Sequence, residues 1–448
     1  MQARLQLERT WDTRLEPTPR PDVQITPQWG LAKRIGFRLM FVYISLFCIE
    51  FIPYCLGFLQ TPFQKYDLFL HKVAIWYAQH IIHLSYPITV FSNGSGDTTY
   101  DWVLLAIYLT VAAMATIIWS VVDRKRPNYI KLNAWFRTYV RLFLAAVLVL
   151  YGSIKAFPLQ MPFPSFTRLL EPYGESSPMG ILWAFIGASP AYCAITGIVE
   201  TMAGVLLLIP RTKSVGAILS SVAMTHVFIL NMCYDVPVKI LSFHLLLLSV
   251  ILMWPDLRRL ADLLVFNRRI EPVERTPLVT RKWPKRILVG LAVVYSLWIV
   301  AANFIDGYLA YKSLPRITGK RPALYGIWNV DEYTVDGTVR PPLLTDESRW
   351  QKIIFQSEGY GTVKPMVGPN QPYTLKVDTE KKTLEFGKAA DKEWKSNLSF
   401  ERPDNDNIIV TGQWEGHNVQ AKLKRFDDSK FLLPNRGFHW ISETPFNK

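Results

Sequence analysis

Four ionisable side chains interrupt apolar stretches in the second third of the chain: Lys155, Glu200, His226 and His244. An apolar run of about 20 residues is long enough to cross a bilayer as a helix, so these groups are expected at membrane depth. A charged side chain there costs several kcal/mol, and it usually pairs with another group or faces a bundle interior or a water-filled cavity. We therefore expect these side chains to converge on one site.

The spacing around Glu200 places it on the face of a helix that carries small residues. One face of this helix, defined by spacings of three, four and seven residues, carries Cys193, Thr196, Gly197, Glu200 and Gly204. Small residues allow a neighbouring helix to approach closely. Glu200 is therefore expected to point between helices and not into lipid.

Further polar residues are expected at a similar depth. His226 and Cys233 are seven residues apart and share a helical face, and Asn231 lies roughly a right angle away. We take Glu200, His226 and Lys155 as candidate catalytic residues. The candidate substrate-binding residues are His244, Asn231, Glu50 and Tyr151.

A histidine and a carboxylate can donate and accept protons at a carbonyl that is being reduced or re-formed. The predicted site would therefore suit an amphipathic molecule such as a quinone, in a cavity that opens on the outer side of the membrane. The structural alternative is that Glu200 and Lys155 form an ion pair that fixes helix register, with the histidines satisfying backbone or hydroxyl groups.

Composition supports a membrane protein. Half of the 448 residues are hydrophobic, and the net charge of +14 comes from short basic segments beside the apolar runs, where cytoplasmic loops carry Lys and Arg. This distribution argues against nucleic-acid binding. The four cysteines form no CxxC pair, so neither a disulfide scaffold nor a metal site is expected.

The apolar runs predict a membrane α-helical bundle of about seven spans. They cover residues 35–59, 102–122, 138–157, 191–209, 215–234, 239–254 and 287–308. The N-terminus has no signal-peptide pattern, so the first span should act as an uncleaved anchor. The positive-inside rule places the basic loops in the cytoplasm of a multi-pass protein of the bacterial inner (cell) membrane.

These spans define the expected domains. They are a cytoplasmic arm (1–34), two membrane helices with a long outer loop (35–137), a four-helix core (138–254), a basic cytoplasmic loop (255–286), a last membrane helix (287–312) and an extracytoplasmic β domain (313–448).

From Leu324 onward, short alternating runs replace the long apolar ones, as is typical of half-buried strands. About eight such strands predict a closed antiparallel β-barrel or a sandwich, because closure removes exposed edges. The stretch LYGIWNVDEY resembles the first strand of lipocalin-like barrels. In those barrels a Gly-x-Trp, here Gly326 and Trp328, places the indole at the barrel floor.

The four-helix core resembles the DoxX family of small bacterial membrane proteins over about 110 residues. The resemblance rests on a Gly-x-x-Lys near one span end, a Glu followed by Gly and an aliphatic run to a basic turn, and a Gly that starts the next span. These residues are Gly152, Lys155, Glu200, Gly204, Arg211 and Gly216. It implies a quinone as cofactor and a redox partner protein outside the cytoplasm, because family members are associated with thiosulfate:quinone oxidoreductase and other membrane oxidoreductase complexes. The extra spans and the β domain depart from a minimal family member.

Three functions are consistent with the sequence. The first is a quinone-interacting component of a membrane redox system. The second is a non-enzymatic membrane scaffold or chaperone whose outer β domain binds a partner or lipid. The third is a carboxylase-like enzyme that uses Lys155 as a base, since the order of Lys, Glu and His also resembles the membrane domain of vitamin K-dependent carboxylase relatives.

Overall fold

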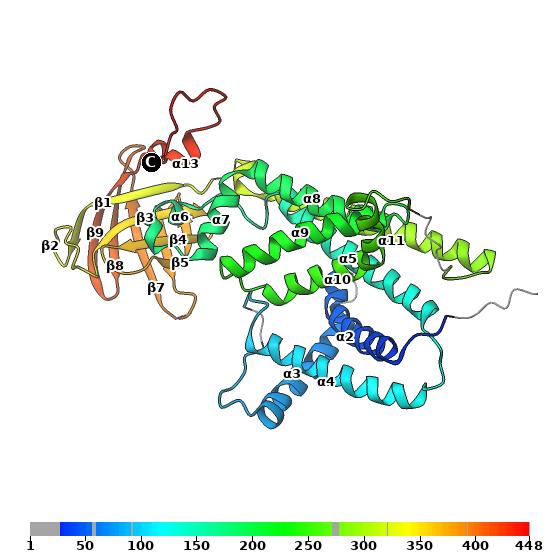
Figure 1. Cartoon of the computed structure of the whole chain (residues 1–448). Coiled ribbons are helices and arrows are strands. Elements are labelled where there is room, and N and C mark those ends of the chain that lie inside the picture. The colour runs from blue at the N-terminus through cyan, green and yellow to red at the C-terminus, as the bar shows by residue number, and fades with distance from the viewer. Residues whose placement is uncertain are drawn as a thin grey trace, which may run out of the picture. The chain divides into compact units, whose positions relative to one another are not determined.

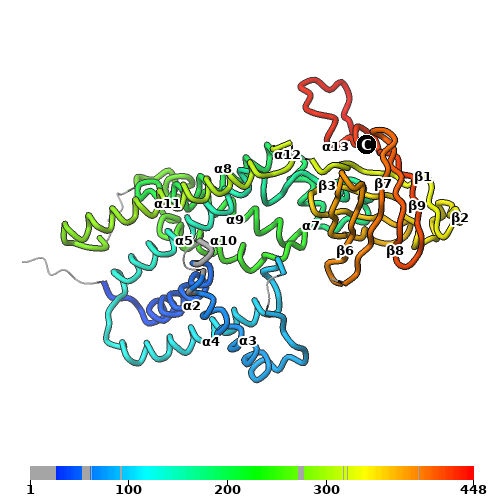
Figure 2. The backbone as a smooth tube through the Cα atoms, turned by 180° about the vertical axis from the view of Figure 1, so that it is seen from behind, coloured from blue at the N-terminus to red at the C-terminus, as the bar shows by residue number. Residues whose placement is uncertain are grey.

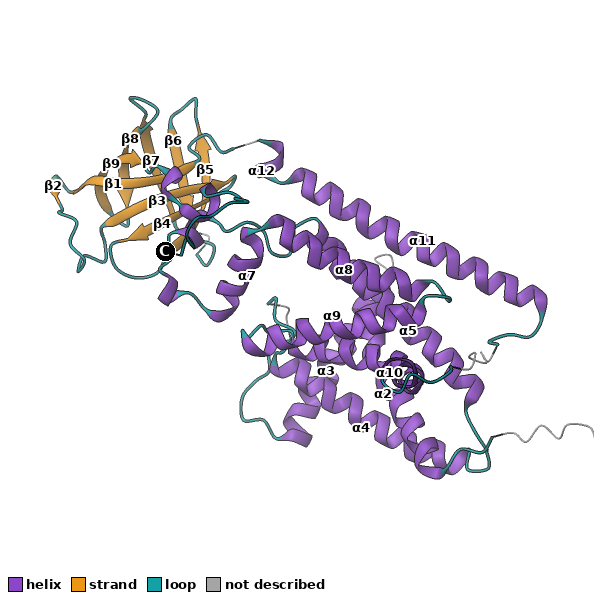
Figure 3. Ribbon diagram, turned by 45° about the horizontal axis from the view of Figure 1, so that its top comes forward, coloured by secondary structure: helices purple, strands orange, loops and turns teal. Residues whose placement is uncertain are grey.

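The computed structural model describes residues 27–55, 60–90, 93–270, 277–319, 321–391 and 393–447. The chain forms two compact units. Unit 1 comprises Met1–Asn93, Thr98–Tyr139 and Glu271–Lys285, and unit 2 comprises Gly94–Asp97, Val140–Ile270 and Arg286–Lys448. Helices make up the first part of the chain and strands the last part (Figure 3).

The longer helices are α2 (Leu31–Cys55), α3 (Gln60–Tyr77), α4 (Thr99–Val122), α5 (Ile130–Ala156), α7 (Pro178–Ala188), α8 (Pro190–Leu208), α9 (Lys213–Cys233), α10 (Lys239–Leu264) and α11 (Lys282–Ser313). Short helical pieces are η2 (Ala78–Ile82), α6 (Phe166–Leu169), η3 (Tyr173–Glu175), α12 (Pro315–Thr318), η4 (Asp428–Lys430) and α13 (Leu432–Asn435).

Within the described residues, seven helices are long and apolar enough to cross a membrane. They lie at Leu31–Ile52, Thr99–Val122, Ile130–Ala156, Pro190–Leu208, Lys213–Cys233, Lys239–Leu264 and Lys282–Ser313. The predicted helical bundle is thus confirmed, and the chain has the character of a multi-pass membrane protein.

The sixth helix runs further than the sequence indicates. A break is expected at Pro255, because proline has no N–H to donate within a helix, yet α10 continues to Leu264. Contacts beyond the proline stabilise this extra stretch: Ser214 Oγ donates to Asp256 Oδ2 at 2.5 Å, and Arg259 pairs with Asp256 at 3.4 Å. The predicted end at residue 254 was therefore wrong.

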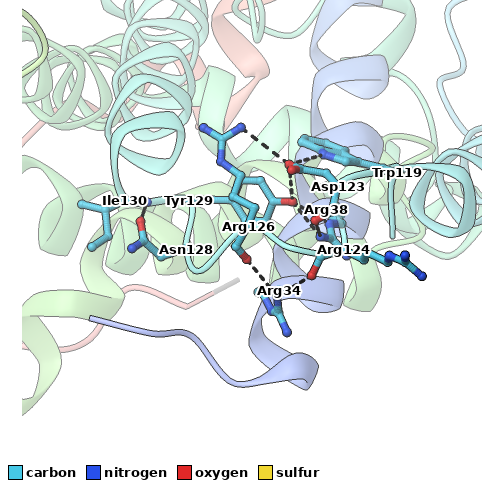
Figure 4. A network of polar contacts seen from close by, with 9 residues as sticks. All are labelled: Arg34, Arg38, Trp119, Asp123, Arg124, Arg126, Asn128, Tyr129 and Ile130. Atoms are coloured by element: carbon cyan, nitrogen blue, oxygen red, sulfur yellow. Dashed lines mark hydrogen bonds and ion pairs between the residues drawn. The ribbon is translucent and has the colours of Figure 1, made fainter. Parts of the chain in front are cut away.

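In unit 1, a buried arginine joins α2 to the turn between α4 and α5 (Figure 4). Arg38 Nε and Nη2 donate to Tyr129 Oη at 2.9 and 2.7 Å, and Nη1 donates to Ser120 Oγ at 2.7 Å. Tyr129 in turn donates to Asp123 Oδ2 at 2.9 Å. Burial raises the pKa of Asp123, but hydrogen bonds from Tyr129 and Trp119 outweigh it and hold that pKa below its usual value.

The C-terminal part of unit 2 is a closed antiparallel barrel. Its strands are β1 (Gly326–Val335), β2 (Thr338–Val339), β3 (Trp350–Ser357), β4 (Tyr360–Pro365), β5 (Gln371–Asp378), β6 (Thr383–Gly387), β7 (Lys395–Glu401), β8 (Asn407–Trp414) and β9 (His417–Arg425). Each strand from β3 on pairs with the next, β1 pairs with β3, and β1 also pairs with β9, which closes the barrel. Figures 1 and 2 show β1 beside β9, with the short β2 at the end of β1. The predicted barrel is thus confirmed, with eight strands in the closed ring beside β2.

The barrel interior is filled with side chains. Trp414 lies at the centre of an aromatic cluster, with ring centroids 4.8 Å from Trp350, 5.1 Å from Tyr373, 5.3 Å from Phe386 and 5.2 Å from Trp394. Trp328, expected at the barrel floor, is buried, and its Nε1 donates to Leu324 O at 2.9 Å. This interior is a packed core.

The loop between α5 and α7 attaches to the barrel. Phe166 forms an apolar cluster with Ile327 of β1 and Ile354 of β3. The backbone N–H of Phe166 donates to Gln356 Oε1 at 2.7 Å. The barrel is therefore held by this loop as well as by the chain that follows α11.

We predict that Trp414→Ala lowers the free energy of unfolding by about 3–5 kcal/mol, because it leaves a cavity among the packed aromatic rings. The loss of near-ultraviolet circular dichroism on heating the full chain would measure it. Tyr360→Ala on β4 is the control: this side chain is exposed, so the change should stay within about 0.5 kcal/mol. Equal effects of the two substitutions would contradict the packed-core description.

Candidate functional site

The site in unit 2 begins with a close crossing of α5 and α8. A Cβ atom added at Gly197 would lie 2.3 Å from Ala156 N and 2.5 Å from Gly152 O. One added at Gly152 would lie 2.6 Å from Thr201 N. The two backbones are in contact, which is possible only because neither glycine has a side chain.

This crossing brings the two charges together. Lys155 lies three residues after Gly152, and Glu200 lies three residues after Gly197, so each charge is on the face that carries its glycine. Lys155 Nζ donates to Glu200 Oε1 at 2.5 Å, and both residues are buried. Cys193 adds a link, its Sγ donating to Lys155 O at 3.5 Å. The predicted α8 face therefore lies against α5.

A cavity of about 120 Å³ opens beside this ion pair. Its walls come from α5, α7, α8, α9, α10 and the loop after α5. Five of the predicted site residues line it: Tyr151, Lys155, Glu200, His226 and Asn231. The other lining residues include Gln160, Met161, Leu182, Trp183, Ile186, Tyr192, Thr196, Leu230, Leu241, Ser242 and Leu245.

Three buried polar atoms of the lining residues have no hydrogen-bond partner in the described part of the chain. They are Glu200 Oε2, Asn231 Nδ2 and Gln160 Oε1. Buried polar groups in proteins are nearly always hydrogen-bonded, and each exception calls for an explanation such as a bound molecule. The wall of the cavity therefore contains three polar residues with hydrogen-bonding capacity that the described residues do not use.

Gln160 was missed by the sequence analysis. It follows α5 in a proline-rich loop, where no periodicity indicates which side chains face inward. The available signal was its position as a single amide in the otherwise apolar stretch FPLQMPF.

Two predicted site residues lie elsewhere. His244 is buried in α10, and its Nδ1 lies 2.7 Å from Ile240 O, but it is not among the residues that line the cavity. Glu50 belongs to unit 1, where Tyr108 Oη donates to its Oε2 at 3.1 Å. The direction of the His244 side chain around its helix and the division of the chain into two units were not predicted from the sequence.

His226 lines the cavity and, like Tyr192, is exposed. No group of three His, Cys, Asp or Glu residues suited to a metal ion occurs in the described part of the chain.

We predict that Gly197→Ala separates α5 from α8 and destabilises the protein by about 1–3 kcal/mol or more, because the added methyl group meets backbone atoms that cannot move aside. Gly290→Ala in α11 is the matched control, since nothing lies within 4 Å of the added Cβ. Thermal unfolding in detergent measures both. A Gly197→Ala protein as stable as the control would show that the helices are not in backbone contact.

We also predict that Lys155→Met costs about 3–5 kcal/mol, because it leaves the Glu200 carboxylate buried without its counter-charge. The double variant Lys155→Met with Glu200→Met should recover most of this loss, since a buried ion pair can be replaced by apolar residues at little cost. Unfolding titrations in mixed micelles compare the three proteins. If the double variant loses as much free energy of unfolding as the two single substitutions together, Lys155 and Glu200 do not interact directly.

No family model and no solved structure matches the chain. A protein of Bacillus subtilis (strain 168), described as uncharacterized protein YwoB, is 33% identical over 141 residues. The match covers 32% of this chain and 87% of YwoB. Because the match spans most of that protein, the chain belongs to the same family as YwoB.

Proposed function

We propose that the cavity beside the Lys155–Glu200 pair binds the head group of a quinone, and that the protein is a quinone-interacting component of a membrane redox system. The observation that carries this proposal is that Glu200, Asn231 and Gln160 line one cavity and that each has a buried polar atom without a partner among the described residues.

The residues suit such a head group in polarity. A cavity of roughly 150 Å³ in another protein takes up a benzene ring, so a space of about 120 Å³ holds only part of a substituted ring, and the rest of the molecule would extend out of it. Asn231 Nδ2 can donate to a carbonyl oxygen, and Glu200 Oε2 can accept from a hydroxyl group. Quinone and quinol present these two groups on one ring.

The remaining walls suit the apolar part of the molecule. Leu182, Trp183 and Ile186 of α7 line the cavity on one side, and Leu241 and Leu245 of α10 on another. Ligand sites are commonly apolar, with a few polar groups that fix orientation. Asn231, Glu200 and Gln160 would thus orient the ring.

When bound, a quinone supplies reversible two-electron chemistry that is coupled to protons at its oxygen atoms. The residues of this chain would donate and accept those protons. Glu200 Oε1 is paired with Lys155, and Oε2 has no partner among the described residues. His226 lines the same cavity. We assign proton transfer at the ring oxygens to Glu200 and His226.

We further propose that the protein lies in a bacterial cell membrane with its N-terminal arm in the cytoplasm and its barrel outside. Segments 1–34, 123–137, 210–213 and 255–286 carry most of the basic residues near the spans, as cytoplasmic segments do. A redox partner protein would then reach the barrel from outside the cytoplasm, as the resemblance to DoxX proteins implies.

The carboxylase-like alternative is less well supported. A lysine that acts as a base must be neutral, and an adjacent carboxylate favours the charged form of an amine. Lys155 is in direct contact with Glu200. The scaffold alternative remains compatible with the barrel, but the filled barrel core means that a partner would contact its outer surface.

We predict that Asn231→Leu and Gln160→Leu each weaken binding of a short-tail ubiquinone or menaquinone about tenfold or more, because each removes a buried hydrogen bond worth about 1–3 kcal/mol. Equilibrium binding of the radiolabelled quinone to protein in nanodiscs measures the loss.

Asn303→Leu in α11 is the matched control. The side-chain amide of Asn303 already donates to Ile299 O at 2.7 Å, and Asn303 does not line the cavity. Its affinity should equal that of the parent. Absence of quinone binding in the parent, or equal affinity in all four proteins, would refute the proposal.

A further inference from the structure

The residues after β9 expose large apolar side chains that no described part of the chain covers. Trp440 is 91% exposed, Ile441 78% and Phe438 75%. Leu432 and Leu433 of α13 are also exposed. We refer to residues 432–446 as the C-terminal apolar segment. Apolar side chains gathered in this way on a protein surface mark a site of interaction.

This segment leaves the barrel at the end that contacts the helices. Phe431, just before α13, packs against Phe426 with ring centroids 5.2 Å apart. Both belong to the cluster formed by Phe166, Ile327 and Ile354. Phe166 lies in the loop that connects α5 to α7. The segment therefore begins beside a loop that follows α5, one of the candidate membrane spans.

The chain after α11 reaches the barrel from the same end of the bundle. Phe157, the residue after α5, packs against Phe304, Tyr308 and Tyr311 of α11, with ring centroids 5.7, 6.1 and 6.2 Å away. The C-terminal ends of α5 and α11 thus lie together. Only residues 314–325 separate α11 from β1, and about 3.3–3.6 Å per residue is the most they can span. Both connections hold the barrel near the C-terminal ends of α5 and α11.

We propose that the C-terminal apolar segment inserts into the lipid interface on the barrel side of the membrane. Its composition matches that site, because Trp and Phe favour the interface and basic residues pair with lipid phosphates. Lys430 and Arg436 flank the exposed rings. The segment would anchor the barrel to lipid at a third point. This inference does not depend on the quinone proposal.

A photoreactive benzoylphenylalanine placed at position 440 of the full chain tests the proposal. The protein is reconstituted in nanodiscs of phosphatidylcholine and phosphatidylglycerol and irradiated, and intact-mass spectrometry then detects adducts. Position 344 is the matched control. Leu344 is 77% exposed but lies between β2 and β3, beyond the opposite end of β1.

We expect phospholipid adducts to form several-fold more often at position 440 than at position 344. We expect the same yield of lipid adducts when the photoreactive residue is placed at position 438. This second position checks that the result does not depend on the substitution at 440. Equal yields of lipid adduct at 440 and 344 would overturn the proposal, as would a cross-link to a second copy of the chain in place of lipid.

Discussion

The backbone contact between α5 and α8 is the constraint on which the site depends. Gly152 and Gly197 remove the side chains that would otherwise hold these helices apart, and the charged residues one turn further along then meet. The length of the Lys155 side chain would allow other partners in a looser bundle. Because the glycines let the two helices pack closely, Glu200 lies within reach of Lys155. Helix packing therefore determines which residue pairs with the lysine.

A buried ion pair is not an efficient way to stabilise a protein, because desolvation of both charges offsets most of their attraction. The pair in unit 2 is also incompletely satisfied, since only one carboxylate oxygen of Glu200 is bonded. In the low-dielectric interior of a protein, a buried polar group that lacks a hydrogen-bond partner raises the free energy of the folded state. Such an arrangement is more readily understood as part of a binding site than as a device for stability, and the amides of Asn231 and Gln160 point to the same conclusion.

Much of this could be predicted from the sequence, because the physical signals are local. Apolar runs of sufficient length define the spans, and alternation defines the strands of the barrel. The three-four-seven spacing of Cys193, Gly197 and Glu200 was enough to identify the face that packs on α5. The need to protect edges left a barrel and a sandwich open, and the pairing of β1 with β9 decides for the barrel.

Three features could not be predicted from the sequence. They are the direction of a side chain around its helix, the direction of side chains in loops, and contacts between residues that are far apart in the chain. His244 was placed in the site on depth alone, but the direction of a side chain around its helix is not fixed by depth, and His244 contacts Ile240 O and does not line the cavity. Gln160 lies in a loop, where no period indicates direction. The extension of α10 past Pro255 depends on Ser214, which is distant in sequence.

The loop after α5 performs two tasks within a few residues. Gln160 and Met161 line the cavity, and Phe166 is embedded between β1 and β3. Because so short a stretch of chain has little slack, a rotation of the barrel must either break the Phe166 contact or carry the cavity wall with it. The wall of the cavity and the surface of the barrel are thus joined through a few residues of one loop.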